Sequence, residues 1–258
     1  MRALDIEARL TLCNMATEFS AMTGLIAPDE KTFAYLEGRR FAPRGDSWRR
    51  AVEHCRSLVS DDEATFDREI EIDAGRLEPM ITWGTSPQHA VGISGHVPGL
   101  AESGTTREAY ERALAYMDVK PGDDLQSLAI GSAFIGSCTN SRISDLRRAA
   151  AILRGRRVAP GVRAICVPGS MSVKRQAEAE ALDRDFVDAG FEWRESGCSM
   201  CFYAGGESFG PRERVVSSTN RNFESRQGPE TRTHIASPET VVASAIAGHL
   251  ADPRRLRD

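Results

Sequence analysis

The stretch that decides the fold is LAIGSAFIGSCTNSRISDLRRAAAIL, residues 128–153. Its first part, Leu128–Ile135, is an apolar run of strand length that stops at a Gly-Ser pair. Its last part, Arg142–Leu153, carries apolar residues at helical spacing, namely Ile143, Leu146, Ala150 and Leu153. These patterns predict a strand, a short loop and a helix, in that order.

The same alternation continues towards the carboxyl end. Strands are predicted over Val162–Val167, Phe191–Glu195 and Val215–Thr219, and a helix over Val173–Ala189, with Gly190 as its C-terminal cap. A last helix, Thr240–Leu250, follows Ser237-Pro238-Glu239, which supplies an N-cap, a first-turn proline and an early acid. Alternating strands and helices predict an α/β fold of three layers, α/β/α, around a mainly parallel sheet.

The amino-terminal half is less regular. Helical spacing predicts helices within Leu4–Phe19 and Ser47–Val59, and Lys120-Pro121-Gly122 lies in the most linker-like segment. We therefore predict two domains, residues 1–120 and residues 121–258, the second carrying the spaced cysteines. The stretch Pro79–Ala101 has no charged residue, although 27% of the chain is charged. Such a loop either faces a site or another chain, or is an ordinary buried loop with two short strands.

Composition excludes several classes of protein. Lys plus Arg number 33 and Asp plus Glu 37 among 258 residues, a net charge of −4, so nucleic acid is not an expected partner. The longest uncharged stretch, Pro79–Ala101, is too polar for a membrane span, and the charges within Met1–Ala8 argue against a signal peptide. We expect a soluble globular protein of the cytoplasm, where spaced thiols indicate metal or redox chemistry.

Three of the six cysteines follow predicted strands. Cys138 follows the first strand, and Cys198 and Cys201 form a Cys-x-x-Cys after the third. Carboxyl ends of parallel strands lie at one edge of a sheet, so the three thiols can converge there. Three thiolates without a fourth favour a metal centre with an open position, which acts as a Lewis acid. A zinc site, a redox dithiol or a buried Cys138 remain the alternatives, and no role is assigned to Cys13, Cys55 and Cys166.

Seven segments resemble the aconitase and isopropylmalate dehydratase superfamily, in that family's order. The most specific are IGSCTNS at 135–141, GCSMC at 197–201 and TNRNFESR at 219–226; the others are LCNMATE at 12–18, APDE at 27–30, TWGTSP at 82–87 and SPE at 237–239. The CSMC and TWGT forms are more similar to isopropylmalate and homoaconitate dehydratase large subunits than to mitochondrial aconitase.

The resemblance implies roles for particular residues. Cys138, Cys198 and Cys201 would bind three irons of a [4Fe-4S] cluster, whose fourth iron would bind substrate. Asn14 and Glu18 match positions near the substrate and that iron, with Glu18 in a catalytic role. Asn220, Arg221 and Arg226 match a segment that holds substrate carboxylates, a task suited to the planar guanidinium group.

The resemblance also implies partners, because it covers only the later part of the family's large subunit. An amino-terminal domain that supplies His and Asp groups for protonation, and a small subunit that supplies a serine base, are expected from other chains. The implied function is a component of a hydro-lyase that isomerises a hydroxy polycarboxylic acid such as isopropylmalate, in leucine biosynthesis. The alternative is a non-catalytic cluster-binding or regulatory relative. Ser225 stands where the family pattern usually has glycine, so a positive φ at this position would be strained.

Overall fold

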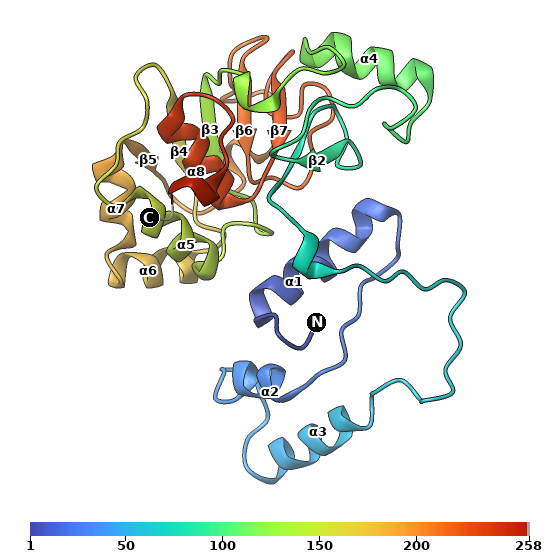
Figure 1. Ribbon diagram of the computed structural model, residues 1–258. Helices are drawn as coiled ribbons and strands as arrows, with labels where there is room; N and C mark the ends of the chain where they lie inside the picture. Colours follow the sequence, from blue (N-terminus) through green and yellow to red (C-terminus); the bar gives the residue numbers. More distant parts are fainter. Residues whose placement is uncertain (257–258) are drawn as a thin grey trace. The chain divides into compact units, whose positions relative to one another are not determined.

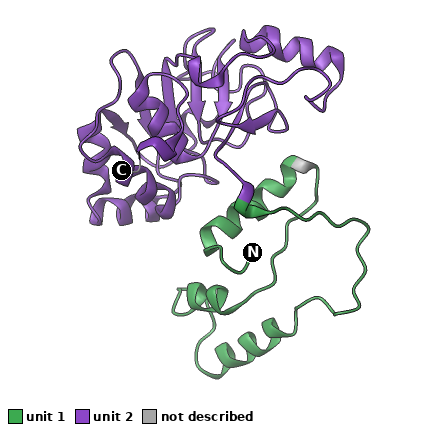
Figure 2. Ribbon diagram, viewed as in Figure 1, with its two compact units in different colours: residues 1–75 green, residues 76–258 purple. Residues whose placement is uncertain are grey.

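The computed structural model describes residues 1–256 and divides into two compact units, Met1–Gly75 and Arg76–Asp258 (Figure 2). The predicted boundary after residue 120 falls inside the second unit, in the turn that follows helix α4, Arg107–Met117. The two units are defined by how the chain packs, and the predicted domain boundary after residue 120 stays a prediction.

The first unit consists of short helices with little core. It contains α1 (Ile6–Met15), the 3-10 turn η1 (Ala16–Phe19), α2 (Glu30–Leu36), α3 (Asp46–Arg56) and most of η2 (Ala74–Arg76). Arg9 of α1 donates two hydrogen bonds of 2.8 Å to the carboxylate of Asp29, which also caps α2. Among the side chains described in this unit, only those of Arg9 and Phe33 are buried. Packing within the unit therefore leaves most of its apolar side chains uncovered.

The second unit is built on a five-stranded parallel sheet of order β5-β4-β3-β6-β7 (Figure 1). The strands are β3 (Ser132–Ile135), β4 (Arg163–Cys166), β5 (Phe191–Trp193), β6 (Arg214–Ser217) and β7 (Arg232–Ile235). The chain runs outward from β3 to β5 on one side and then returns to β6 on the other. The strand order therefore reverses between β3 and β6, and in such sheets ligands bind outside the carboxyl ends of the strands at this point.

The two faces of this sheet are covered differently. Ala133, Ile135 and Val216 pack into the larger core together with α5 (Ile143–Leu153), α7 (Leu182–Ala189) and α8 (Pro238–Ala247). On the opposite face Phe134 and Val215 pack against Met200 and Phe209 of the segment that follows β5. The predicted α/β fold with a parallel sheet is confirmed, and a loop-rich segment forms this part of the second covering layer.

The predicted helix Val173–Ala189 is wrong in one respect, because it is two helices, α6 (Met171–Ala179) and α7. Ala181 at the break has a left-handed backbone, with φ of +57°. The preceding Glu180 accepts two hydrogen bonds from Arg147 of α5, at 2.6 and 2.7 Å. The other predicted helix signals are confirmed: Gly190 ends α7 with φ of +104°, and the Ser237 hydroxyl caps α8.

The charge-free stretch contains the short antiparallel strands β1 (Met80–Thr82) and β2 (Ala90–Gly92). Trp83 and Ile93 are buried in the larger core, as the buried-loop interpretation expects. The turn between the strands instead lines a pocket, described below. The remaining 3-10 turns are η3 (Leu125–Ser127), η4 (Ser199–Cys201) and η5 (Pro253–Leu256). No helix in residues 1–256 combines the length and the apolar character needed to cross a bilayer.

Candidate functional site

The three predicted cluster cysteines come together at the carboxyl edge of the sheet. Cys138 and Cys198 are exposed, and Cys201 is half-buried. Burial raises the pKa of the Cys201 thiol, the positive charge of Arg226 lowers it, and the charges of Cys198 and Cys138 raise it further. The three thiols therefore lie within electrostatic reach of one another, although 60 residues separate Cys138 from Cys198 in sequence.

The loop that carries Cys138 is fixed from both neighbouring strands. The Gly136 amide donates to the hydroxyl of Ser218, just after β6, and the Asn140 side chain donates to the Ser218 carbonyl, both at 3.1 Å. On the other side the Ser141 hydroxyl donates to the carbonyl of Val167, just after β4, at 2.8 Å. The position of Cys138 thus follows from the order of strands in the sheet.

Gly169 allows the next loop to approach this one closely. Its amide donates to the Ser141 carbonyl at 2.9 Å, and a Cβ atom at this position would lie 2.8 Å from the same oxygen. Any larger residue would push the two loops apart.

An ion-pair network holds the loop that carries Cys198 and Cys201. Glu207 accepts hydrogen bonds of 2.6 Å from both Arg194 and Arg163, and Arg163 also bonds Glu192. The two arginines lower the pKa of Glu207 to about 2. The charges of this network are therefore mutually neutralised beside the thiols.

Arg226, one of the three predicted carboxylate-binding residues, contacts a cysteine of the site. One guanidinium nitrogen is 4.0 Å from the Cys201 sulfur, and the guanidinium carbon lies 5.1 Å from the ring centres of both Phe202 and Phe223. Its Nε atom is buried and has no hydrogen-bond partner among the described residues. A buried donor without a partner is costly, so this N–H indicates a place for a ligand acceptor.

Asn220 and Arg221 lie in the same loop, which follows β6. Asn220 is half-buried and Arg221 is exposed. Between Arg221 and Phe223 lies Asn222, which the sequence analysis missed. This buried amide donates to the carbonyls of Gly84 and Thr233, at 2.7 and 3.0 Å, and anchors the loop.

Asn14 and Glu18 belong to the first unit, Asn14 near the end of α1 and Glu18 in η1. They are four residues apart, with Asn14 exposed and Glu18 half-buried. The three cysteines and the arginines lie in the second unit. The predicted approach of Asn14 and Glu18 to the cluster and substrate stays a prediction.

The donor set is one that an iron–sulfur cluster takes. In residues 1–256 no three His, Cys, Asp or Glu side chains gather closely enough to form a ready site for one metal ion. A [4Fe-4S] cluster takes one thiolate on each of several irons, so its cysteines surround a volume instead of one point. Three neighbouring thiols on loops from two strands, next to a guanidinium group, suit such a cluster.

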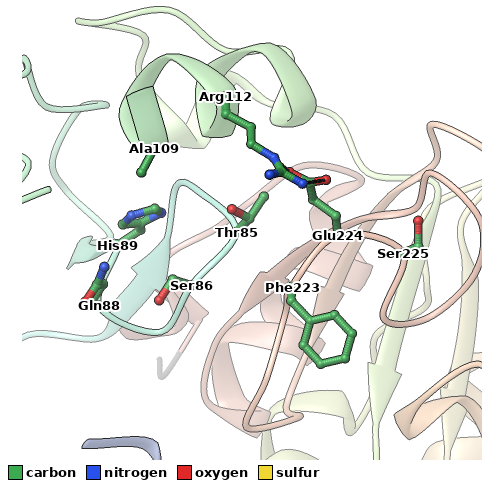
Figure 3. Close-up of a pocket in the computed structure, with 9 residues that line it drawn as sticks. All are labelled: Thr85, Ser86, Gln88, His89, Ala109, Arg112, Phe223, Glu224 and Ser225. Atoms are coloured by element: carbon green, nitrogen blue, oxygen red, sulfur yellow. Dashed lines mark hydrogen bonds and ion pairs between the residues drawn. The ribbon is translucent and has the colours of Figure 1, made fainter. Parts of the chain in front are cut away.

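A pocket of about 570 Å³ lies beside the 220–226 loop (Figure 3). Its lining combines the turn of the charge-free stretch, helix α4 and this loop: Thr85, Ser86, Gln88, His89, Ala109, Arg112, Phe223, Glu224 and Ser225. The His89 ring stacks on Trp83 at 4.5 Å between centroids, and burial lowers its pKa. Arg112 donates to both oxygens of Glu224, at 2.7 and 2.9 Å. Sequence patterns gave no signal for this pair, because 112 residues separate its members.

The fold and these motifs define a class of protein. The model of the aconitase family (aconitate hydratase), a family of hydro-lyases, matches residues 1–248, and the chain belongs to this family. It is 65% identical over 257 residues to the 3-isopropylmalate dehydratase large subunit of Cupriavidus necator, covering 99% of this chain and 96% of that protein.

Two further relatives are longer. The 3-isopropylmalate dehydratase large subunit 1 of Bradyrhizobium diazoefficiens is 55% identical, and the large subunit of Roseiflexus castenholzii is 52% identical. Each alignment covers 99% of this chain but 54% of the relative, so the chain spans about half the length of these two proteins.

Proposed function

We propose that this chain supplies the cluster-binding and carboxylate-binding part of a 3-isopropylmalate dehydratase type of hydro-lyase. The observation that carries the proposal is the guanidinium group of Arg226, which has an unpartnered buried Nε and lies 4.0 Å from the sulfur of Cys201. A dehydratase of hydroxy polycarboxylates needs a carboxylate-binding cation next to its metal centre, and this arrangement meets that need.

The residues have distinct tasks in this proposal. Cys138, Cys198 and Cys201 hold a [4Fe-4S] cluster, which when bound supplies an open Lewis-acid iron that polarises the substrate hydroxyl group. Arg226 binds one substrate carboxylate through its Nε and a terminal nitrogen, and the rings of Phe202 and Phe223 lie near its guanidinium group. Arg221 and Asn220, from the same loop, bind the remaining carboxylate oxygens.

Proton transfer needs groups from outside the second unit. We propose that a serine of a small subunit removes the carbon-bound proton, and that Glu18 and Asn14 act near the leaving hydroxyl group. Segments equivalent to the rest of the longer relatives, on this polypeptide or on a separate one, supply the remaining acid. The substrate is a hydroxy polycarboxylate such as isopropylmalate, and the reaction belongs to leucine biosynthesis in the cytoplasm, where six free thiols persist.

The first unit supports the need for a covering partner. Met22, Leu25 and Phe41 are 100%, 88% and 89% exposed. Exposed apolar side chains on consecutive segments are typical of an interaction surface. We propose that the segments equivalent to the rest of the longer relatives cover them.

Anaerobic reconstitution with iron and sulfide tests the cluster assignment. About one [4Fe-4S] cluster per chain is expected, since each of the three thiolates binds one iron. Cys138→Ser, Cys198→Ser and Cys201→Ser should each lose the cluster, whereas Cys55→Ser, on α3, should keep it. Stoichiometric zinc without uptake of iron and sulfide would overturn the assignment.

Steady-state kinetics with 3-isopropylmalate, small subunit and complementing segments tests the activity. Arg226→Lys should lower kcat/KM by about 10- to 100-fold, because an ammonium group cannot make two parallel hydrogen bonds to a carboxylate. The matched control is Arg175→Lys, on α6 and away from the loop. A reconstituted complex that holds the cluster but has no turnover would instead favour the non-catalytic relative.

A further inference from the structure

Helix α4 reaches the Arg226 loop through two side chains one helical turn apart, Arg112 and Tyr116. Arg112 donates to both carboxylate oxygens of Glu224, at 2.7 and 2.9 Å, and Figure 3 shows its side chain extending from the helix to that residue. The Tyr116 hydroxyl accepts from the amide of Ser225 at 2.7 Å and donates to the carbonyl of Thr231 at 2.9 Å. Two consecutive residues just before Arg226 are thus held by one helix.

The backbone between these contacts has little freedom. Ser225 has a left-handed backbone, with φ of +64°, and its hydroxyl accepts from the Glu230 amide at 3.1 Å. The Arg226 amide donates to the Phe223 carbonyl at 3.0 Å, and its carbonyl accepts from Tyr203 at 2.7 Å. The direction in which the Arg226 side chain leaves the loop is therefore set by the contacts that fix residues 224 and 225.

The Glu224 carboxylate also needs a cation. It lies two residues before Arg226, in a loop whose proposed ligand is itself a carboxylate. Without Arg112, its charge would repel that ligand and compete for the guanidinium group of Arg226. The Arg112 side chain is 72% exposed, so the pair adds little to folding stability. The bidentate geometry of the pair instead fixes the orientation of the Glu224 side chain and offsets its negative charge.

We propose that Arg112 and Tyr116 are positioning residues that hold the loop of Arg226 and neutralise Glu224, so that Arg226 stays available for a substrate carboxylate. This inference rests on the proposed function for its substrate. The position of α4 in the fold, packed near β7 with Tyr110 and Ala113 in the core, makes it a rigid support for this loop.

A double-mutant cycle in the reconstituted enzyme tests whether Arg112 neutralises Glu224. Arg112→Gln should raise the KM for 3-isopropylmalate about five-fold with little change in kcat, and Arg112→Gln with Glu224→Gln should restore it in part, since the competing carboxylate is gone while the bidentate contact that holds the loop is still lost. Arg107→Gln, which removes an exposed ion pair with Glu111 on the same helix, should match the wild type. A KM for Arg112→Gln equal to that of Arg107→Gln, or no recovery in the double variant, would overturn the proposal.

Hydrogen exchange of the unreconstituted chain tests whether Tyr116 holds the loop of Arg226, and it requires no catalytic activity. The Ser225 amide should exchange about ten-fold faster in Tyr116→Phe than in the wild type, because its acceptor is lost. Tyr110→Phe removes a hydroxyl from the same helix that bonds Pro98 instead, and should leave Ser225 unchanged. Equal exchange rates of the Ser225 amide in the two variants would refute the proposal that Tyr116 holds the loop. If the variants show the expected exchange pattern but the wild type has no turnover, the proposed function is wrong and the positioning of the loop is not.

Discussion

His234 should make the second unit sensitive to mild acid. This β7 side chain is fully buried, with Nδ1 2.6 Å from the carbonyl oxygen of Thr82 and Nε2 2.8 Å from a guanidinium nitrogen of Arg214. Because arginine only donates, Nε2 accepts and Nδ1 carries the proton that it donates to Thr82. The ring is therefore neutral, and a second proton would have to face Arg214.

The size of the effect follows from the shift in pKa. Burial, and then the charge of Arg214, lower the pKa of His234 from 6.5 to about 3. The unfolded chain takes up a proton below its ordinary pKa while the folded chain does not, so stability is present above about pH 6.5 and is lost as the pH falls towards 3. Between pH 6 and pH 4 this single group should lower the free energy of unfolding by about 2.5 kcal/mol.

The perturbation is His234→Gln, compared with the wild type by urea unfolding at pH 7, 6, 5 and 4. Tryptophan fluorescence, to which the buried Trp83 of this unit contributes, reports the transition. The variant should be less stable at pH 7, by about 1 to 3 kcal/mol for the lost hydrogen bonds, but its stability should fall less steeply with acid. His89, whose pKa is also lowered by burial, remains in both proteins, so its contribution cancels in the difference.

His96→Gln is the matched control, because that histidine is exposed in the same unit. It should leave the slope against pH unchanged. The assignment of a neutral buried ring would be refuted if His234→Gln and the wild type lost the same stability with acid. The criterion is that their losses of the free energy of unfolding between pH 6 and pH 4 differ by less than about 0.5 kcal/mol.

Three further outcomes can be measured directly. Ser225→Gly should change the free energy of unfolding by less than about 0.5 kcal/mol in urea titrations, because relief of the left-handed backbone is offset by the entropy cost of glycine and by loss of the hydrogen bond from the Glu230 amide. Gly169→Ala should destabilise by about 2 kcal/mol and reduce iron incorporation, since its Cβ atom would meet a backbone oxygen at 2.8 Å, whereas Gly99→Ala, in open space, should do neither. In iodoacetamide labelling followed by mass spectrometry at pH 8, Cys138 should react and Cys166 should not, because burial raises the pKa of the Cys166 thiol well above its ordinary value.

Local signals explain which elements could be predicted from sequence. The strand, loop and helix around Cys138, and the Ser237 cap of α8, depend on apolar spacing and on side chains within a few residues. Strand β7 was missed, because Arg232-Thr233-His234-Ile235 has no apolar run to reveal a buried strand. Its buried histidine bonds a distant partner instead, the Thr82 carbonyl.

The same distinction between local signals and contacts with distant residues applies to the site. The gathering of Cys138 with the Cys-x-x-Cys loop could be predicted, because the carboxyl ends of parallel strands share one edge and two motifs mark those ends. The contacts that orient the arginine loop could not. Arg112, Tyr116 and Asn222 act through partners at least 11 residues away, and their residue types are ordinary in a helix or a turn. The roles of all the predicted site residues stay predictions until the experiments above are made.

The distribution of charge around the thiols explains why the loop after β6 suits an anionic ligand. Glu207 is neutralised by Arg194 and Arg163, and Glu224 by Arg112, so these two acids are already paired. The guanidinium group of Arg226 has no carboxylate partner among the described residues and contacts the sulfur of Cys201 instead. A thiolate-bound cluster is itself anionic, and a polycarboxylate could approach it only where a cation offsets that charge. In the proposed function the paired acids leave Arg226 to supply this cation, and for that reason removal of Arg112, a residue that need not touch substrate, should weaken substrate binding.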